Sequence, residues 1–344
     1  MTEKVPLAAI FGCSGPTLGD QERAFFADTQ PLGFILFGRN CENPAQVREL
    51  VDSLRQCVGR DNAPVLIDQE GGRVQRLKPP HWRDAPAAAE FAALYEKDSA
   101  LGIEAARLNA YLIAHELTAL GITVDCAPVL DVVQPGADPI IGDRAFGGDP
   151  LTIAALGQAT CEGLLMGGVL PVLKHIPGHG RADVDSHKAL PRVDAPYETL
   201  SACDFAPFRA LKGMPWAMSA HVLYTALDGN QPATLSGDVI ALIRGDLGFD
   251  GVLVSDDLSM QALSGTLSER TTGALAAGCD VALHCNGEMD EMKMVAAGCQ
   301  GLTAQALTRI ERGAVMALEN RVALAGSFSD AVSALDSMMA GEGD

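Results

Sequence analysis

The sequence of 344 residues is poor in aromatic and basic residues. Aromatic residues make up 5% of the chain, which is too few for an extended base-stacking surface. Lys and Arg number 25 against 44 Asp and Glu, and the resulting net charge of −19 argues against nucleic-acid partners and anionic membrane surfaces. No apolar run reaches the roughly 18 residues of a transmembrane helix. The apolar stretch at 6–12 lacks a signal-peptide cleavage pattern, so we interpret it as a strand.

Cofactor and disulfide signatures are also missing. The nine cysteines are scattered and form no C-x-x-C pair, which indicates reduced thiols in a cytoplasmic protein. Neither G-x-G-x-x-G after a strand nor G-x-x-x-x-G-K-[ST] occurs, so dinucleotide and nucleoside-triphosphate binding lose support. We therefore expect no cofactor, and a monomer is the default expectation.

Apolar residues make up 48% of the chain, and they fall into short runs that alternate with helical stretches. The runs are continuous rather than alternating, as in strands buried on both faces. The expected strands are 6–12, 33–38, 64–68, 123–130, 169–176, 216–223, 251–255 and 280–284. The main expected helices are 44–58, 99–120, 151–166, 236–247, 268–277 and 302–320.

Eight β-then-α units predict an α/β fold with a single (β/α)₈ TIM-like barrel, which we assign to residues 1–324. A doubly wound sheet with a small second domain is the alternative. The stretch 78–93 is expected to be a long irregular loop. Residues 325–344 are expected to form a loosely held C-terminal tail.

Ionisable residues gather where the predicted strands end, and the C-terminal ends of the strands carry the active site in barrels of this kind. A solvated rim explains such residues on one or two strands, but here they follow four or five. These strand-end residues are Asp68, Glu70, Arg73, Arg76, Asp131, Lys174, His175, Ser219, His221, Asp256 and Asp257.

The loop at 174–187 is the richest of these segments, because it holds three of the seven histidines. Asp185 and His187 are two residues apart, so in an extended loop their side chains lie on one side, where the carboxylate can orient the imidazole for general acid/base work. A structural role for any one of these histidines and a metal site formed by His175, His179 and His187 remain alternatives.

Two further readings compete with catalysis at the strand ends. Lys174 and Arg76 are also suited to plain salt bridges with Asp68. The acids that follow the seventh predicted strand are suited to capping the next helix, although a cap accounts for only one of them.

Several of these segments together resemble the single-domain bacterial β-N-acetylhexosaminidases of glycoside hydrolase family 3, cytoplasmic enzymes of peptidoglycan recycling. The resemblance spans roughly residues 5–290, with the motifs in the family's order. It is carried by DQEGGRVQR at 68–76, KHIPGHG at 174–180, DSH at 185–187 and SDDLSM at 255–260.

The resemblance implies a role for each matching residue. Asp256 is then the nucleophile, and His187 is the general acid/base with Asp185 as its partner. The residues that would hold the terminal N-acetylglucosamine are Asp68, Arg76, Arg144, Lys174 and His175. No metal is implied. Strand parity places Asp256 and Asp257 on opposite faces but does not say which face is the barrel axis.

The implied activity is that of a retaining exo-β-N-acetylglucosaminidase acting on glycan or muropeptide fragments. Its covalent glycosyl-enzyme would form on Asp256, and a His–Asp pair would replace the usual second carboxyl. We expect Lys174, Arg76 or Arg144 to hold the pKa of Asp256 down.

The glycines that flank the 174–187 loop predict an acid/base loop that opens and closes. The alternatives are a family-3 glycosidase or phosphorylase of other sugar preference, a metal-dependent amidohydrolase-type barrel, and a sugar-binding module without chemistry.

Overall fold

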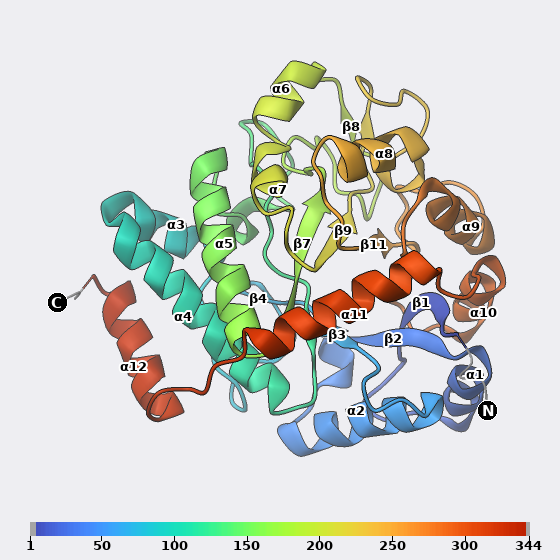
Figure 1. Ribbon diagram of the computed structural model, residues 1–344, viewed down its shortest axis with the longest axis horizontal. Helices are drawn as coiled ribbons and strands as arrows, with labels where there is room; N and C mark the ends of the chain where they lie inside the picture. The colour runs from blue at the N-terminus through green and yellow to red at the C-terminus, as the bar shows by residue number, and fades with distance from the viewer. Residues whose placement is uncertain (1–4, 342–344) are drawn as a thin grey trace.

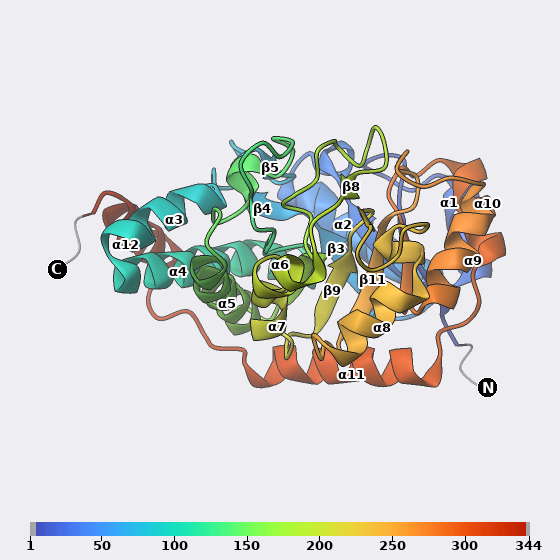
Figure 2. The ribbon, with the colours of Figure 1, turned by 90° about the horizontal axis from the view of Figure 1, so that it is seen from above.

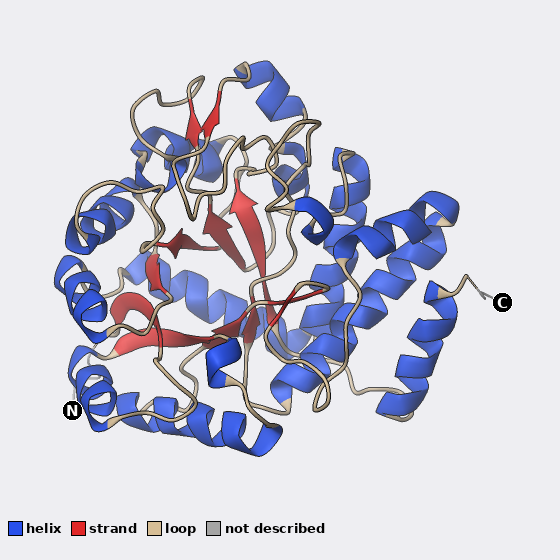
Figure 3. Cartoon of the chain, turned by 180° about the vertical axis from the view of Figure 1, so that it is seen from behind, coloured by secondary structure: helices blue, strands red, loops and turns tan. Residues whose placement is uncertain are grey.

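The computed structural model describes residues 5–341, and in this range eight parallel strands close into a barrel enclosed by helices (Figures 1 and 3). The predicted single (β/α)₈ barrel is therefore confirmed. In their order around the barrel, the strands are β1 Leu7–Gly12, β2 Pro31–Leu36, β3 Val65–Ile67, β6 Val124–Asp125, β7 Leu170–Ile176, β9 Trp216–Ser219, β11 Val252–Asp257 and β12 Val281–His284.

Helices make up most of the connections between the strands. Helix α2 shows how local sequence sets their bounds, because the Asn43 side chain accepts hydrogen bonds from the backbone of Ala45 and Gln46 while Pro44 occupies the first helical position. The helices of the barrel are α1 Asp20–Thr29, α2 Pro44–Val58, α3 Ala88–Lys97, α4 Ser99–Thr118, α5 Pro150–Met166, α6 Tyr197–Ala202, α7 Ala206–Ala210, α8 Gly237–Gly245, α9 Leu267–Ala277, α10 Met289–Gly298 and α11 Ala304–Glu319.

Helix α11 runs across one end of the barrel, and the long loops gather at the other end (Figure 2). The covered end is the N-terminal end of the strands, where Gly313 of α11 lies against Trp216 at the start of β9. Arg309 of α11 is 7% exposed and forms ion pairs with Asp280 and Asp250 there. The C-terminal ends of the strands are therefore left for the loops that carry polar side chains.

Two small sheets lie outside the barrel. Strands β4 (Gln69–Gly71) and β5 (Val74–Gln75) form an antiparallel hairpin directly after β3. Strands β8 (Arg192–Val193) and β10 (Leu223–Tyr224) pair in parallel and connect the loops that follow β7 and β9. Both sheets belong to the chain beyond the C-terminal strand ends, so they fix loops at that mouth of the barrel.

Buried side chains divide into an inner and an outer cluster. The inner one includes Ile35, Leu66, Val172, Val254 and Leu283, each from a different strand, and fills the barrel. The outer one joins the other strand faces to the helices. Because strand side chains alternate in direction, the residue two positions after each inner residue also faces the axis. These positions are Phe37, Asp68, Lys174, Asp256 and Cys285.

Three expected segments differ in the structure. The fourth strand is shorter than expected and is limited to β6, although hydrogen bonds to its neighbours continue beyond it: the Val172 backbone N–H donates to the Ala127 carbonyl at 2.9 Å, and Val129 bridges Lys174. The loop expected at 78–93 ends where α3 begins. The expectation of a loosely held tail is wrong: helix α12 (Phe328–Met339) packs on α4, with Leu335 1% exposed.

Candidate active site

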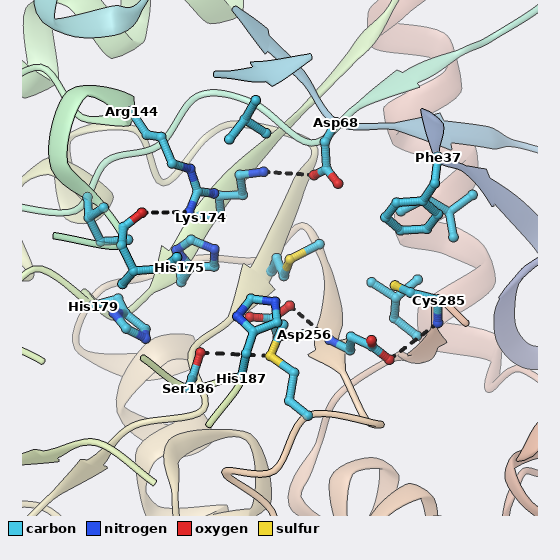
Figure 4. Close-up of a pocket in the computed structure, with 18 of the residues that line it drawn as sticks. Phe37, Asp68, Arg144, Lys174, His175, His179, Ser186, His187, Asp256 and Cys285 are labelled. Carbon is cyan, nitrogen blue, oxygen red and sulfur yellow. Dashed lines mark hydrogen bonds and ion pairs between the residues drawn. The ribbon is translucent and has the colours of Figure 1, made fainter. Parts of the chain in front are cut away.

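A cavity of about 210 Å³ opens directly above the inner core, at the C-terminal mouth of the barrel (Figure 4). Its lining includes all five residues that the alternation of side chains aims at the axis: Phe37, Asp68, Lys174, Asp256 and Cys285. The end of β7 adds His175, and the segments beyond the strands add further polar side chains, namely Arg73, Arg76, Arg144, His179, Ser186 and His187. Of the eight predicted site residues, seven therefore line one cavity, and Asp185 lies behind His187.

Asp256 and Asp257 at the end of β11 have different surroundings. The Asp257 carboxylate accepts hydrogen bonds from the Ser259 hydroxyl at 2.7 Å and from the Ser259 backbone at 3.1 Å. Within the described residues, the carboxylate of Asp256 accepts one hydrogen bond, from the Asp257 backbone at 2.8 Å, and Asp256 is 7% exposed in the cavity. The next helix, α9, is capped by Thr266. Capping therefore does not account for Asp256, which is left facing the cavity.

The charge of Asp256 is stabilised by imidazoles. Burial by itself would raise its pKa, but the charges of His175 and His221 and the hydrogen bond from the Asp257 backbone hold the pKa below its ordinary value. Our expectation that Lys174, Arg76 or Arg144 has this role is wrong, because those cations are paired with other carboxylates. A carboxylate that stays ionised while buried is suited to nucleophilic attack.

Lys174 lies between two carboxylates on the far side of the cavity. Its Nζ atom is 2.9 Å from Asp68 and 2.5 Å from Glu70, and it is 2% exposed. Arg76 pairs with Asp68 at 2.9 Å, and Arg144 pairs with both oxygens of Glu70 at 2.8 Å. Burial opposes ionisation of Asp68, but Lys174 and Arg76 outweigh it and lower the pKa of Asp68. The array offers fixed, charged hydrogen-bonding groups to a polyhydroxylated ligand.

Asp131 ties two histidines to the cavity wall. Its carboxylate accepts hydrogen bonds from the His175 ring at 2.7 Å, from the His175 backbone at 3.1 Å and from the His179 backbone at 2.6 Å. Burial opposes its ionisation, but the charge and hydrogen bond of His175 lower the pKa of Asp131 to about 2. Asp131 therefore fixes the orientation of the His175 ring from outside the cavity.

His187 reaches the cavity on the loop between β7 and β8. Its Nδ1 atom is 2.9 Å from Asp185, and its backbone N–H donates to the same carboxylate oxygen at 2.9 Å. The His187 side chain is 59% exposed, whereas that of Asp185 is 10% exposed. This is the expected carboxylate–imidazole pair, and Figure 4 shows His187 at the Asp256 side of the cavity. The other ring nitrogen is free to face a ligand.

The loop that carries His187 is attached to its surroundings at several points before that residue. A Cβ on Gly180 would lie 2.1 Å from the Val132 carbonyl oxygen, so only glycine permits this close approach. Arg181 pairs with the buried Asp204 at 2.7 Å. Beyond these anchors, the Ser186 carbonyl accepts from the Ala262 backbone at 3.1 Å. The predicted opening and closing of the loop stays a prediction, and breaking the Ser186–Ala262 bond would be its first step.

Sequence reasoning did not assign Glu70, Asp131, His179 or Phe37 to the site. The sequence contained a signal for three of them, because Glu70 and His179 lie inside the motifs that carry the resemblance and Asp131 directly follows the fourth expected strand. Phe37 lies at the end of the second strand but carries no charge, and the predicted site was based on ionisable residues, so Phe37 was not included. The Arg39 and Arg76 guanidinium carbons lie 5.0 and 5.2 Å from its ring centroid.

Within residues 5–341, no three or more His, Cys, Asp or Glu side chains are grouped so that they could hold a metal ion. In the same range, none of the helices has the length and apolar character needed to cross a membrane.

Comparison with known proteins gives consistent results. Residues 13–319 match the model of the glycosyl hydrolase family 3 N-terminal domain. The chain is 40% identical to a β-hexosaminidase of Alkalilimnicola ehrlichii, over 80% of each chain. It is 38% identical to one from Pseudomonas aeruginosa, over 87% of this chain and 88% of the relative. NagZ from Neisseria gonorrhoeae, solved with N-trifluoroacetyl-D-glucosamine, superposes with a TM-score of 0.87 at 30% identity, covering 98% of this chain and 100% of that one.

Proposed function

Because the chain belongs to glycosyl hydrolase family 3 and is a glycoside hydrolase of the β-N-acetylhexosaminidase type, we propose that it releases terminal β-linked N-acetylglucosamine from the non-reducing ends of glycans. The relatives named β-hexosaminidase and the N-trifluoroacetyl-D-glucosamine bound by the Neisseria protein support this sugar preference. Peptidoglycan fragments are the proposed substrates, and a cytoplasmic monomer is the proposed form.

One observation carries the proposal: an ionised, buried carboxylate and a carboxylate-supported imidazole reach the same cavity from different strands. In the first step, the Asp256 carboxylate attacks the anomeric carbon while His187 gives a proton to the departing glycosidic oxygen. In the second step, neutral His187 takes a proton from water, which attacks the same carbon and frees Asp256. Two displacements at one carbon retain its configuration.

The Asp185 carboxylate supports both steps. It favours the imidazolium before the first proton transfer, and it holds the ring in place for the second. General acid/base catalysis of this kind contributes about 10²–10⁴ in rate. His187 is more than half exposed, so incoming water or a leaving group can approach it.

The paired charges opposite Asp256 support exo action. Asp68, Lys174, Arg76 and Arg144 line that end of the cavity and are joined in a chain of ion pairs that runs through Glu70. We propose that they hydrogen bond the hydroxyls of one terminal sugar, as charged groups fixed in place beforehand. His175, fixed by Asp131, would hold a further hydroxyl.

Trapping the glycosyl-enzyme tests the proposal. The protein is incubated with a fluorinated, activated N-acetylglucosamine analogue, digested, and mapped by mass spectrometry. We expect one label on the peptide that contains Asp256, lost in Asp256→Ala and kept in Asp257→Asn. A label on another carboxylate in an active enzyme, or appreciable turnover by Asp256→Ala, would overturn the nucleophile assignment. Repeating the turnover assay with added phosphate and looking for a sugar 1-phosphate distinguishes hydrolysis from phosphorolysis.

A further inference from the structure

His179 is a buried polar side chain on the cavity wall to which the proposed reaction gives no task. It is 3% exposed, lines the cavity, and its ring centroid lies 5.6 Å from that of His175. The backbone N–H of His179 donates to Asp131 at 2.6 Å, which fixes its position. Its Nδ1 atom is buried and has no hydrogen-bond partner within the described part of the chain. Because Nδ1 is enclosed, Nε2 is the ring nitrogen of His179 that can meet a ligand in the cavity.

The remaining surroundings of the cavity indicate which part of a sugar His179 meets. Asp256 and His187 lie at one end, where C1 must be, and Asp68 and Lys174 lie at the other (Figure 4). The other two walls differ in chemistry, since His175 and His179 lie on one and Phe37 and Cys285 on the other. A pyranose held between C1 and C4 turns C2 and C3 to one wall, and C5 and C6 to the opposite wall.

The polar wall matches C2 and C3, because both carbons carry hydrogen-bonding substituents, while the CH and CH₂ groups of C5 and C6 suit Phe37. Of the two positions, C2 is adjacent to the anomeric carbon. In Figure 4, His179 lies farther than His175 from Asp68 and Lys174 and level with His187, so it is at the C1 end of its wall. Two neighbouring polar groups already have partners in the protein. The Nδ1 atom of His175 is paired with Asp131, and the Ser186 hydroxyl contacts the sulfur of Met260.

We propose that His179 is a specificity-determining residue that donates a hydrogen bond to the carbonyl oxygen of the 2-acetamido group. The proposal rests on the function proposed above and extends it to the group that distinguishes N-acetylglucosamine from glucose. Burial and the neighbouring His175 lower the pKa of His179 to about 4, so the ring is neutral in neutral solution. A neutral imidazole has one N–H, and with Nδ1 enclosed and lacking an acceptor, that N–H is placed on Nε2.

The test compares two iminosugar inhibitors that differ only at the carbon equivalent to C2, where one carries a hydroxyl and the other an acetamido group. Inhibition constants are measured for the wild type, His179→Leu, His179→Gln and, as the control from the opposite wall, Phe37→Leu. We expect His179→Leu to weaken the acetamido inhibitor about tenfold, the loss of one buried hydrogen bond, with little effect on the hydroxyl inhibitor. His179→Gln, whose amide can donate from a similar position, should recover most of the preference.

Phe37→Leu should weaken both inhibitors to a similar extent. Equal weakening of both by His179→Leu would show that His179 merely supports His175, and unchanged constants would show that it does not contact the ligand; either result overturns the proposal. If His179→Leu does not fold, His179→Asn replaces it, since its shorter amide does not reach the Nε2 position, and equal preferences in the Asn and Gln variants would refute the donor role. Failure of the proposed function is a separate result, seen as a wild type without N-acetylglucosaminidase turnover.

Discussion

Replacing Asp131 by Asn should destabilise the protein in a pH-dependent manner. The wild-type carboxylate accepts three hydrogen bonds from two histidines and is fully buried. A pKa of about 2 against an ordinary value of 3.8 corresponds to about 2.5 kcal/mol of folding free energy at neutral pH. Asn keeps the shape but loses the charge, and its NH₂ group faces N–H donors. We therefore expect Asp131→Asn to lose at least this amount at pH 7.

The direction of the pH effect follows from the sign of the shift. A carboxyl whose pKa is lowered by folding stabilises the protein above its unfolded value, and this stabilisation disappears as the pH falls through the folded value. The difference between wild type and Asp131→Asn should therefore be full at pH 7 and become smaller below about pH 4. Urea unfolding followed by circular dichroism at several pH values measures it. The control is Asp290→Asn, whose side chain is 95% exposed and whose loss should cost under about 0.5 kcal/mol.

Activity gives a second measurement on the same variant. Without the Asp131 carboxylate, the His175 ring loses the acceptor at Nδ1, and the His179 backbone is released. Misplacement of two wall residues should lower kcat/KM by about 100-fold, even at urea concentrations and temperatures where the variant remains folded. A stability difference that is the same at pH 7 and pH 3, or a variant with wild-type kcat/KM, would refute the reasoning.

Three further predictions concern the loop, the ion pairs and the C-terminus. His187→Ala should slow substrates with poor leaving groups far more than activated aryl glycosides, and equal losses on both would remove the acid role. Lys174→Met should destabilise the protein by about 3–5 kcal/mol, because the carboxylates of Asp68 and Glu70 lose a buried partner. Thermal unfolding measures this, and a variant as stable as wild type would contradict the stabilising role of these ion pairs. A chain ending at residue 324, our proposed end of the catalytic domain, should keep turnover. It should unfold at a lower temperature, because it lacks the buried Leu335. Loss of turnover in the folded, truncated chain would place α12 within the catalytic domain.

Much of the fold and the gathering of ionisable residues at one mouth of the barrel followed from local pattern, whereas the roles of single residues came from the resemblance to family 3. Continuous apolar runs marked all eight strands, since strands buried on both faces have no polar face to interrupt them. All strands of a parallel barrel run in the same direction, so the residues that follow the apolar runs meet at one mouth of the barrel. The sequence therefore predicted that Asp68, Lys174 and Asp256 lie close together. The pairing of Asp185 with His187 could also be predicted from the sequence, because the two residues are only two positions apart in the chain.

Other features depended on contacts between distant parts of the chain. Strand parity placed Asp256 and Asp257 on opposite faces, but only closure of the barrel made the Val254 face the inner one. The partners of Lys174 and Arg144 lie 106 and 74 residues away, in Asp68 and Glu70 respectively.

These long-range ion pairs explain why our expectation for the groups that lower the pKa of Asp256 was wrong. The cations expected beside Asp256 are neutralised by carboxylates, and imidazoles stabilise its charge instead. Helix α12 is the other case. Its apolar residues Phe328, Val332, Leu335 and Met339 recur at helical spacing, but only packing on α4 shows that this face is held against the barrel. Alternation and chain direction are local properties that the sequence by itself determines, whereas burial and pairing of charges exist only once the barrel has closed.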